Sequence, residues 1–264
     1  MGAVNHRHED RYNDRPSDRH IGANSTPTAR WARWLHSAPV AAIELDELLT
    51  PQTRLVVVAP HPDDEVLACG GLLQMHVERG GECVVIAVTD GEASHGDTPK
   101  AAQMRLAVER REESERGLAR LGLHPGAVVR LGLPDGGLLR HAEHLASRLQ
   151  PLLRSSDLVV STWHLDGHPD HDTTGRIAEQ SARRVGARFM AAPVWMWHWS
   201  FPDDMRVPWR SLRQLRLSAS ALALKLAALD AHRTQLAERD AQNGPVLDAP
   251  LLQRAAQPIE FFFV

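Results

Sequence analysis

The chain is poor in cysteine, has no long apolar run and carries no large excess of charge of either sign. Its two cysteines, Cys69 and Cys83, form no CxxC pair. This argues against a disulfide framework and a cysteine-based zinc site, and it favours a reducing, cytoplasmic compartment. The formal net charge of −3 predicts no binding to nucleic acid or to an anionic membrane. No stretch approaches the roughly 18 apolar residues that a transmembrane helix requires.

The N-terminal region also lacks recognisable signals. Residues 1–20 are charged and contain no apolar stretch, so we expect no secretory signal there. Residues 1–27 are polar and without periodicity, which predicts a disordered tail. Residues 28–264 suit one sizeable α/β domain, because 43% of the chain is hydrophobic. The absence of a GxGxxG motif after the first expected strand argues against dinucleotide binding.

From residue 54 onward, short apolar runs alternate with helix-forming stretches. Strands are expected at residues 54–59, 82–88, 127–131, 157–162 and 188–192, and helices at 66–79, 100–121, 141–153 and 173–185. The strand runs are continuously apolar, as in strands buried on both faces of a parallel sheet. The predicted fold class is therefore α/β, a three-layer arrangement with helices on both faces of a mostly parallel sheet.

Two clusters of histidine and aspartate follow expected strands. The sequence His-Pro-Asp-Asp at residues 61–64 comes directly after the strand at 54–59, and His-Pro-Asp-His at 168–171 follows the strand at 157–162. Singly, either cluster could be a helix-capping turn or a polar loop. In open parallel sheets, however, ligands bind beyond the carboxyl ends of strands. Two such clusters at equivalent positions therefore predict one site.

The residue types in these clusters suit a catalytic metal site. His61, Asp64 and His171 offer two imidazoles and a carboxylate, and three protein ligands with an open fourth position are typical of catalytic zinc. Zinc lowers the pKa of a bound water to about 7. Hydrolysis also needs a base for that water and a donor to the oxygen that becomes negative. Asp63 suits the first task and His168 the second.

The segments 59–71 (APHPDDEVLACGG) and 167–172 (GHPDHD) resemble the two signature motifs of the LmbE-like (PIG-L) deacetylase family. The resemblance spans about residues 55–235. It implies a Rossmann-like fold, one divalent metal ion (normally zinc) and hydrolysis of an N-acyl group on an amino sugar. The roles that the motifs imply are metal ligand for His61, Asp64 and His171, general base for Asp63, and oxyanion stabiliser for His168, with Asp170 beside it to orient the ring.

Three weaker matches to the family add candidate substrate contacts. Residues 89–92 resemble a Thr-x-Gly-Glu loop, and Arg110 or Arg111 resembles the arginine of an Arg-x-x-Glu helix, which can face the substrate. Asp135 belongs to a Pro-Asp-Gly loop whose carboxylate can bind sugar hydroxyls, although the same residues also favour an ordinary turn.

The C-terminal third begins with a tryptophan-rich loop at residues 194–209. These rings could stack on a sugar or simply pack in the core, and Trp197 is the candidate for substrate contact. A long helix is expected over 211–239, because leucines and alanines recur three or four positions apart. The final residues, 258–264, read as an edge strand or a docked tail.

The predicted function is removal of an N-acetyl group from an amino-sugar-containing small molecule by zinc-activated water. One alternative is an amidohydrolase acting on a longer N-acyl group or a non-sugar amide. Another is a noncatalytic sugar- or nucleotide-binding Rossmann-like module, against which the retained Asp63 and complete ligand set argue. The sequence leaves the substrate, the native metal and the formation of a homo-oligomer open.

Overall fold

The computed structural model describes residues 19, 21, 25–38, 40–96, 98–239 and 244–264. Most of the predicted tail, residues 1–27, therefore lies outside the described residues. At its end, Thr26 is bound to the fold, because its amide and hydroxyl donate to the backbone oxygens of His198 and Ser200. In the described part of the chain, no helix has the length and apolar character needed to cross a bilayer.

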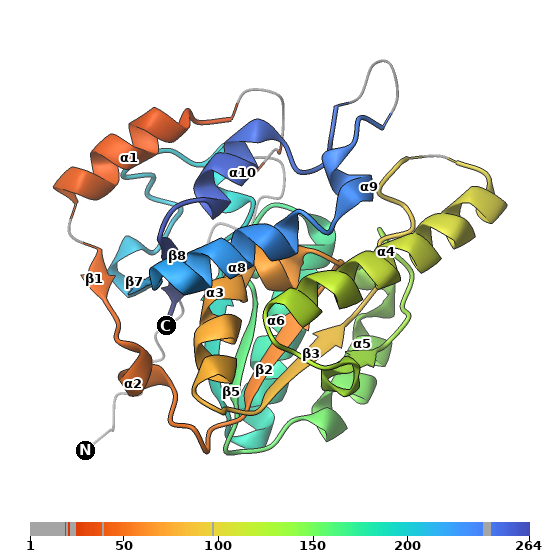
Figure 1. Cartoon of the computed structure of the whole chain (residues 1–264), viewed down its shortest axis with the longest axis horizontal. Helices are drawn as coiled ribbons and strands as arrows, with labels where there is room; N and C mark the ends of the chain where they lie inside the picture. The colour runs from red at the N-terminus through yellow and green to blue at the C-terminus, as the bar shows by residue number, and fades with distance from the viewer. Residues whose placement is uncertain (1–18, 20, 22–24, 39, 97, 240–243) are drawn as a thin grey trace, which may run out of the picture.

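The described residues form an eight-stranded sheet. Its strands are β1 (Ala41–Ala42), β2 (Leu55–Ala59), β3 (Cys83–Ala87), β4 (Val128–Arg130), β5 (Leu158–Thr162), β6 (Arg188–Ala192), β7 (Leu212–Arg216) and β8 (Ile259–Phe263). They lie in the order β1-β7-β8-β6-β5-β2-β3-β4 (Figure 1). Neighbouring strands are parallel except at β8, which runs antiparallel to β6 and β7.

Helices cover both faces of this sheet. They are α1 (Thr28–Ser37), α2 (Leu45–Leu48), α3 (Asp64–Glu78), α4 (Lys100–Arg120), α5 (Ala142–Leu149), α6 (Pro169–Val185), α7 (Met196–Trp199), α8 (Ala219–Leu229), α9 (Arg233–Leu236) and α10 (Ala249–Ala255). Short 3₁₀ turns lie at Pro125–Ala127, Leu138–His141, Gln150–Leu152 and Trp209–Ser211. Helices α3, α4 and α8 bury one face, and α5 and α6 bury the other (Figure 1). The predicted three-layer, Rossmann-like fold is confirmed.

Strand β2 shows why its sequence is continuously apolar. Leu55 and Val57 point into the core under α3 and α8, whereas Val56 and Val58 point into the core under α5 and α6. All four side chains are at most 2% exposed. Complete burial of such side chains stabilises a fold by about 1.5–3 kcal/mol each. A polar residue at any of these positions would lose this stabilisation in one of the two cores.

The order in which the chain adds strands to the sheet reverses at β2, and β5 is added on the opposite side of β2 from β3. From β2 the chain proceeds through α3 to β3 and through α4 to β4, and it then returns to place β5 on the other side of β2. In open α/β sheets, such a reversal gives a ligand-binding crevice beyond the carboxyl ends of the two strands concerned, which are β2 and β5 in this fold. Both histidine-aspartate motifs begin at this crevice.

The predicted long helix over 211–239 is wrong. Residues 212–216 form strand β7, α8 begins only after Ser218, whose side chain caps it by accepting from the Ala221 amide, and α9 is separate. Leu212 and Leu215 suggested a helix by their spacing of three. In β7 they point to opposite faces of the sheet, and each is buried in a different core. Because both faces of β7 are buried, its leucines need not alternate with polar residues, and their spacing of three resembles that of a helix.

The final residues form a strand, as expected, but not at an edge. β8 lies between β6 and β7, and Phe262 and Phe263 are buried. Apart from Glu260, the strand is apolar, which is typical of the interior of a sheet because both of its faces are covered.

Candidate active site

The first motif forms a tight turn between β2 and α3. Asp63, at the N-cap of α3, has φ 124° and ψ −31°, a conformation rarely adopted by residues other than glycine. Its amide donates to Oε2 of Glu65 at 3.0 Å, and the Ser114 hydroxyl donates to Oε1 of the same carboxylate at 2.7 Å. These bonds hold the turn in its unusual conformation.

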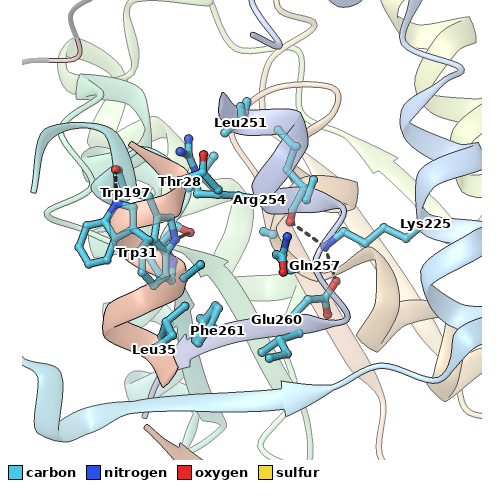
Figure 2. A pocket seen from close by; sticks show the side chains of 17 residues that line it. Thr28, Trp31, Leu35, Trp197, Lys225, Leu251, Arg254, Gln257, Glu260 and Phe261 are labelled. Carbon is cyan, nitrogen blue, oxygen red and sulfur yellow. Dashed lines mark hydrogen bonds and ion pairs between the residues drawn. The ribbon is translucent and has the colours of Figure 1, made fainter. Parts of the chain in front are cut away.

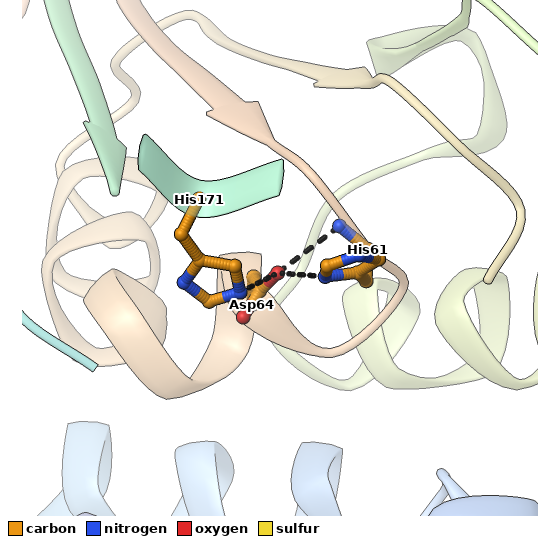
Figure 3. A group of neighbouring side chains, drawn as sticks. All are labelled: His61, Asp64 and His171. Atoms are coloured by element: carbon orange, nitrogen blue, oxygen red, sulfur yellow. Dashed lines mark hydrogen bonds and ion pairs between the residues drawn. The ribbon is translucent and has the colours of Figure 1, made fainter. Parts of the chain in front are cut away.

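The three predicted metal ligands lie together at the crevice (Figure 3). Oδ2 of Asp64 lies 3.1 Å from Nδ1 of His61 and 3.2 Å from Nε2 of His171. One ligand atom from each residue falls within 4.8 Å of the others. Two imidazole nitrogens and a carboxylate oxygen converging in this way can hold a metal ion.

Asp166, which the sequence analysis did not single out, fixes the orientation of one ligand. Its Oδ2 lies 2.8 Å from Nδ1 of His171, so that Nε2 of the ring faces Asp64. The Asp166 carboxylate also accepts from the amides of Val194, Trp195 and Met196 at the start of α7. Carboxylates commonly orient metal-binding histidines in this manner. Its position five residues before His171, next to the second motif, is the signal that could have identified it.

The pKa values show that the site favours positive charge. Burial lowers the pKa of His171, but Asp64 and Asp166 outweigh it and raise the value to about 9. Burial likewise lowers the pKa of His61, but its carboxylate neighbours hold it well above its ordinary range. For Asp64, burial raises the pKa, yet the two imidazoles hold it far below its ordinary value. In the two histidines a proton takes the place of a cation, so the negative surroundings that raise their pKa values also suit a divalent metal bound to the neutral rings.

Asp63 lies beside the metal group without belonging to it. The residue is 4% exposed, and Nη2 of Arg110 lies 3.1 Å from its Oδ2. Burial raises the pKa of Asp63 to about 8, and the Arg110 charge opposes this shift. The raised pKa makes the carboxylate a stronger base, and a bound cation nearby would lower the value and free the group of its proton near pH 7, as a general base requires.

Arg110, a predicted substrate contact, is buried behind Asp63. Its guanidinium donates to the carbonyls of Gly91 and Pro62, each at 2.7 Å, and it is 2% exposed. Gly91 has φ +68°, and a Cβ there would lie 1.7 Å from Nη1 of Arg110, so only glycine fits. These contacts make Arg110 a support for Asp63, and its contact with substrate stays a prediction. The alternative, Arg111, contacts Asp90 at the surface.

His168 is held by a main-chain group of the second motif. The Asp170 amide donates to Nδ1 of His168 at 3.2 Å, so a neutral ring carries its proton on Nε2. Burial and the neighbouring His171 and His61 lower the pKa of His168 to about 3, which keeps the ring neutral at pH 7. Nε2 is therefore a hydrogen-bond donor.

The Asp170 carboxylate does not orient His168 as predicted. It accepts from the amides of Gly136 and Leu138 at 2.7 and 3.1 Å, and Oδ2 lies 3.5 Å from Nε2 of His61. Among the described residues, no hydrogen bond joins this carboxylate to the His168 ring. The Asp170 amide takes that role, because His168 is the N-cap residue of α6 and its side chain accepts from this amide.

Asp135 joins the site from the loop after β4. Its Oδ1 lies 3.1 Å from Nε2 of His61, and its Oδ2 accepts from the Ala93 amide at 2.8 Å. Burial raises the pKa of Asp135, but His61 outweighs it and the value falls to about 2. His61, Asp135 and Asp170 form a second group that could hold a metal ion, so His61 stands between two acidic sets. The substrate role of Asp135 stays a prediction.

Trp197 lies in a different part of the molecule's interior. Its ring packs edge-on against Trp31, with centroids 5.0 Å apart, and its indole N–H donates to the Pro193 carbonyl. It lines a cavity of about 90 Å³ between α1, α10 and β8, and none of the metal or catalytic candidates lines that cavity (Figure 2). The position favours the packing role that the sequence left open, and substrate contact by Trp197 stays a prediction.

The family described as PIG-L, GlcNAc-PI de-N-acetylase, matches residues 56–182. This segment runs from β2 through α6 and contains both motifs. Residues 56–182 are therefore a PIG-L family domain, and the resemblance drawn from the motifs is confirmed.

Similar proteins carry names of deacetylases. A Mycobacterium sp. (strain KMS) protein named 1D-myo-inositol 2-acetamido-2-deoxy-alpha-D-glucopyranoside deacetylase is 28% identical over 160 residues, covering 50% of this chain and 51% of the relative. A Corynebacterium diphtheriae protein of the same name is 28% identical over 255 residues, covering 78% and 84%. The chain thus spans about half the length of the first relative.

The fold is shared with a crystal structure described as A40926 pseudoaglycone deacetylase. The two superpose with a TM-score of 0.58 and 22% identity, covering 80% of this chain and 96% of the other. This likeness shows that the architecture of the family extends beyond the matched segment.

Proposed function

We propose that this protein is a zinc-dependent hydrolase that removes an N-acetyl group from an amino-sugar-containing small molecule. The observation that carries the proposal is the separation of roles at the crevice. Asp64 brings His61 and His171 together around one carboxylate oxygen, while Asp63, next in sequence, is held outside this group by Arg110. The PIG-L domain and the names of its relatives, which specify acetamido sugars, support this choice of bond and substrate class.

His61, Asp64 and His171 would hold the metal. We infer zinc because two imidazoles and one carboxylate with an open position are typical of its catalytic sites. When bound, the ion would polarise the amide carbonyl and make water a stronger nucleophile. Asp166 keeps His171 turned toward the site throughout.

Asp63 and His168 carry out the proton transfer and charge stabilisation. Asp63 accepts a proton from the water as its oxygen attacks the acetyl carbon, and it delivers that proton to the nitrogen as the C–N bond breaks. The products are acetate and a free amine. His168 donates from Nε2 to the carbonyl oxygen as that oxygen becomes negative. Its lowered pKa suits this donor role and leaves the transfer of the proton to Asp63. We expect Asp135 to accept from a sugar hydroxyl.

A deacetylation screen with defined metal content tests this proposal. The zinc-loaded protein is incubated with a panel of N-acetylglucosamine derivatives, and acetate and free amine are measured by mass spectrometry. We expect stoichiometric release of both products from at least one compound. Release of a longer acid, or the same turnover by Asp63→Asn, would contradict the assignment.

A further inference from the structure

Helix α3 is interrupted in the middle of its buried length. Cys69 has φ −152° and ψ 29°, which is not helical, and helical residues stand on either side of it. The short segment before the interruption, Asp64–Ala68, carries the carboxylate of the metal group. The geometry of the interruption therefore determines where that carboxylate lies.

A buried ion pair from two other elements occupies the backbone groups around this interruption. In a regular helix the Gly71 amide would donate to the Leu67 carbonyl. In this protein the Gly71 amide donates to Oε1 of Glu260 at 2.7 Å, and Nζ of Lys225 donates to the Leu67 carbonyl at 3.1 Å. Lys225 and Glu260 are joined at 2.7 Å (Figure 2). The ion pair thus stands between the donor and the acceptor of one helical hydrogen bond.

The sequence at the interruption allows these elements to approach closely. A Cβ on Gly71 would lie 2.5 Å from Leu217, just before α8, and a Cβ on Gly70 would lie 3.2 Å from Cγ of Lys225. Oε2 of Glu260 accepts in addition from the Leu72 amide at 2.9 Å. The Cys-Gly-Gly sequence therefore provides both the interruption and the space for the pair that occupies it.

Stability alone is a poor reason for this arrangement. The side chains of Lys225 and Glu260 are 2% and 1% exposed, so both charges have lost their hydration. The attraction within a buried pair rarely does more than offset that loss, and apolar residues of similar size often serve a fold as well. Side chains inserted into the helical hydrogen-bond ladder do, however, bend helices at defined places.

We propose that Lys225 on α8 and Glu260 on β8 are positioning residues for the metal group. By holding α3 broken at Cys69, they set the direction of its first segment and with it the place of the Asp64 carboxylate. The inference rests on the metal site of the proposed function. It gives the C-terminal part of the chain, beyond the matched PIG-L segment, a specific influence on the site.

The double variant Lys225→Met/Glu260→Met tests the inference. It removes both charges at similar side-chain volume, so no unpaired charge is left buried. The Gly71 amide and the Leu67 carbonyl can then bond to each other, which straightens α3 and displaces Asp64. We expect the affinity of the folded apoprotein for Zn²⁺, measured by chelator competition, to fall ~10-fold or more, as when outer partners of metal ligands are removed. The melting temperature without metal should stay the same or rise.

The matched control is Arg54→Met/Asp157→Met. Nη2 of Arg54 and Oδ2 of Asp157 lie 2.7 Å apart, with side chains 9% and 0% exposed, so this ion pair is equally close and similarly buried. It joins the starts of β2 and β5, at the opposite end of these strands from the site. We expect the control to bind Zn²⁺ as the wild type does. Wild-type affinity in the Lys225/Glu260 double variant, or an equal loss in the control, would overturn the inference.

A milder pair of variants serves if the double variant does not fold. Glu260→Gln keeps the size and one acceptor oxygen, and Asp157→Asn is its control. A loss of Zn²⁺ affinity confined to Glu260→Gln supports the inference, and equal affinities overturn it.

The zinc measurement separates this inference from the proposed function because it needs no substrate. Zinc binding by the wild type without acetate release would refute the deacetylase and leave the affinity comparison intact. If the wild type is active and the folded Lys225/Glu260 variant binds Zn²⁺ with the same affinity, only the positioning role is refuted. A wild type that binds no zinc would refute both.

Discussion

The two motifs that meet at the crevice are held in place by different means. The first, residues 61–64, depends on side chains from elsewhere in the chain. Arg110 on α4 contacts the Asp63 carboxylate, and Ser114, one turn later, contacts Glu65, which in turn binds the Asp63 amide. The local contact to the Asp63 amide, from Glu65, is itself held by Ser114.

The second motif, residues 168–171, is supported mainly by main-chain amides. It lies at the start of α6, where His168 occupies the N-cap with ordinary extended dihedrals and accepts from the Asp170 amide. The Asp170 carboxylate accepts from the Gly136 and Leu138 amides. The cap by His168 follows from local sequence, whereas the Gly136 and Leu138 amides come from a distant loop.

From this difference we expect Asp63, the proposed base, and His168, the proposed oxyanion donor, to respond differently to distant substitutions. The first half of the site stores an unusual backbone conformation and needs remote side chains to maintain it. The second half begins a helix with a common capping arrangement, so we expect distant substitutions to affect it less. Four predictions, from the largest expected effect to the smallest, examine this contrast.

The largest effect is expected when a metal ligand is removed from either half. Asp64→Ala and His171→Ala should each abolish metal binding and activity, because the two ligands come from different motifs and neither motif alone completes the group. Metal content by atomic spectroscopy, alongside the deacetylation assay, measures this. Full occupancy in either variant would show that the halves do not share one ion.

The base in the first half should be separable from metal binding. Asp63→Asn is expected to retain the metal and lower kcat by ~100-fold or more, since the side chain keeps its shape but no longer accepts a proton. Kinetics are compared at equal metal content. Turnover within a few-fold of the wild type would remove Asp63 from the mechanism.

The corresponding change in the second half concerns His168. His168→Ala should retain the metal and lower kcat by ~100-fold, the usual effect of removing one donor to a developing oxyanion. A drop in metal content would instead place His168 among the ligands, and unchanged kinetics would leave it without a catalytic role.

Substitution of two neighbouring arginines of α4 tests whether remote side chains hold the first motif in place. Arg110→Met leaves Asp63 buried without its partner, so we expect a loss of about 3 kcal/mol in the free energy of unfolding and a fall in kcat of ~10-fold or more from misplacement of the base. Arg111→Met is the comparison variant: the Arg111 side chain is 45% exposed, and its partner Asp90 also has Arg130 3.9 Å away, so we expect the smaller loss. Equal losses of stability and of kcat in the two variants would show that Arg110 supports the site no more than Arg111 does.

Much of the site was predictable because its parts are local. Continuous apolar runs identified β2 and β5, and the two motifs follow these strands directly, so their meeting at one edge followed from the rules of parallel sheets. The predicted strand at 188–192 coincides with β6. The donor types of His61, Asp64 and His171 were sufficient to predict a metal group, which the structure brings together.

Other features depended on contacts between distant segments. The spacing of Leu212 and Leu215 is compatible with a helix. They lie in a strand whose two faces are both buried, and sequence spacing does not reveal that burial. Arg110 was a candidate substrate contact because its helix resembles the Arg-x-x-Glu helix of the family, yet the fold buries it against Asp63. Trp197 was equally ambiguous until its packing against Trp31 was seen.

The sequence by itself determined which atoms are available at the crevice: two imidazoles and a carboxylate for a metal, a second carboxylate as base and a third imidazole as donor. It could do so because these residues lie within a few positions of strand ends. The tertiary structure decided how these groups are arranged and which neighbours hold them. The orientation of His171 by Asp166, the backing of Asp63 by Arg110 and the ion pair that replaces a helical hydrogen bond in α3 depend on distances that sequence separation does not contain.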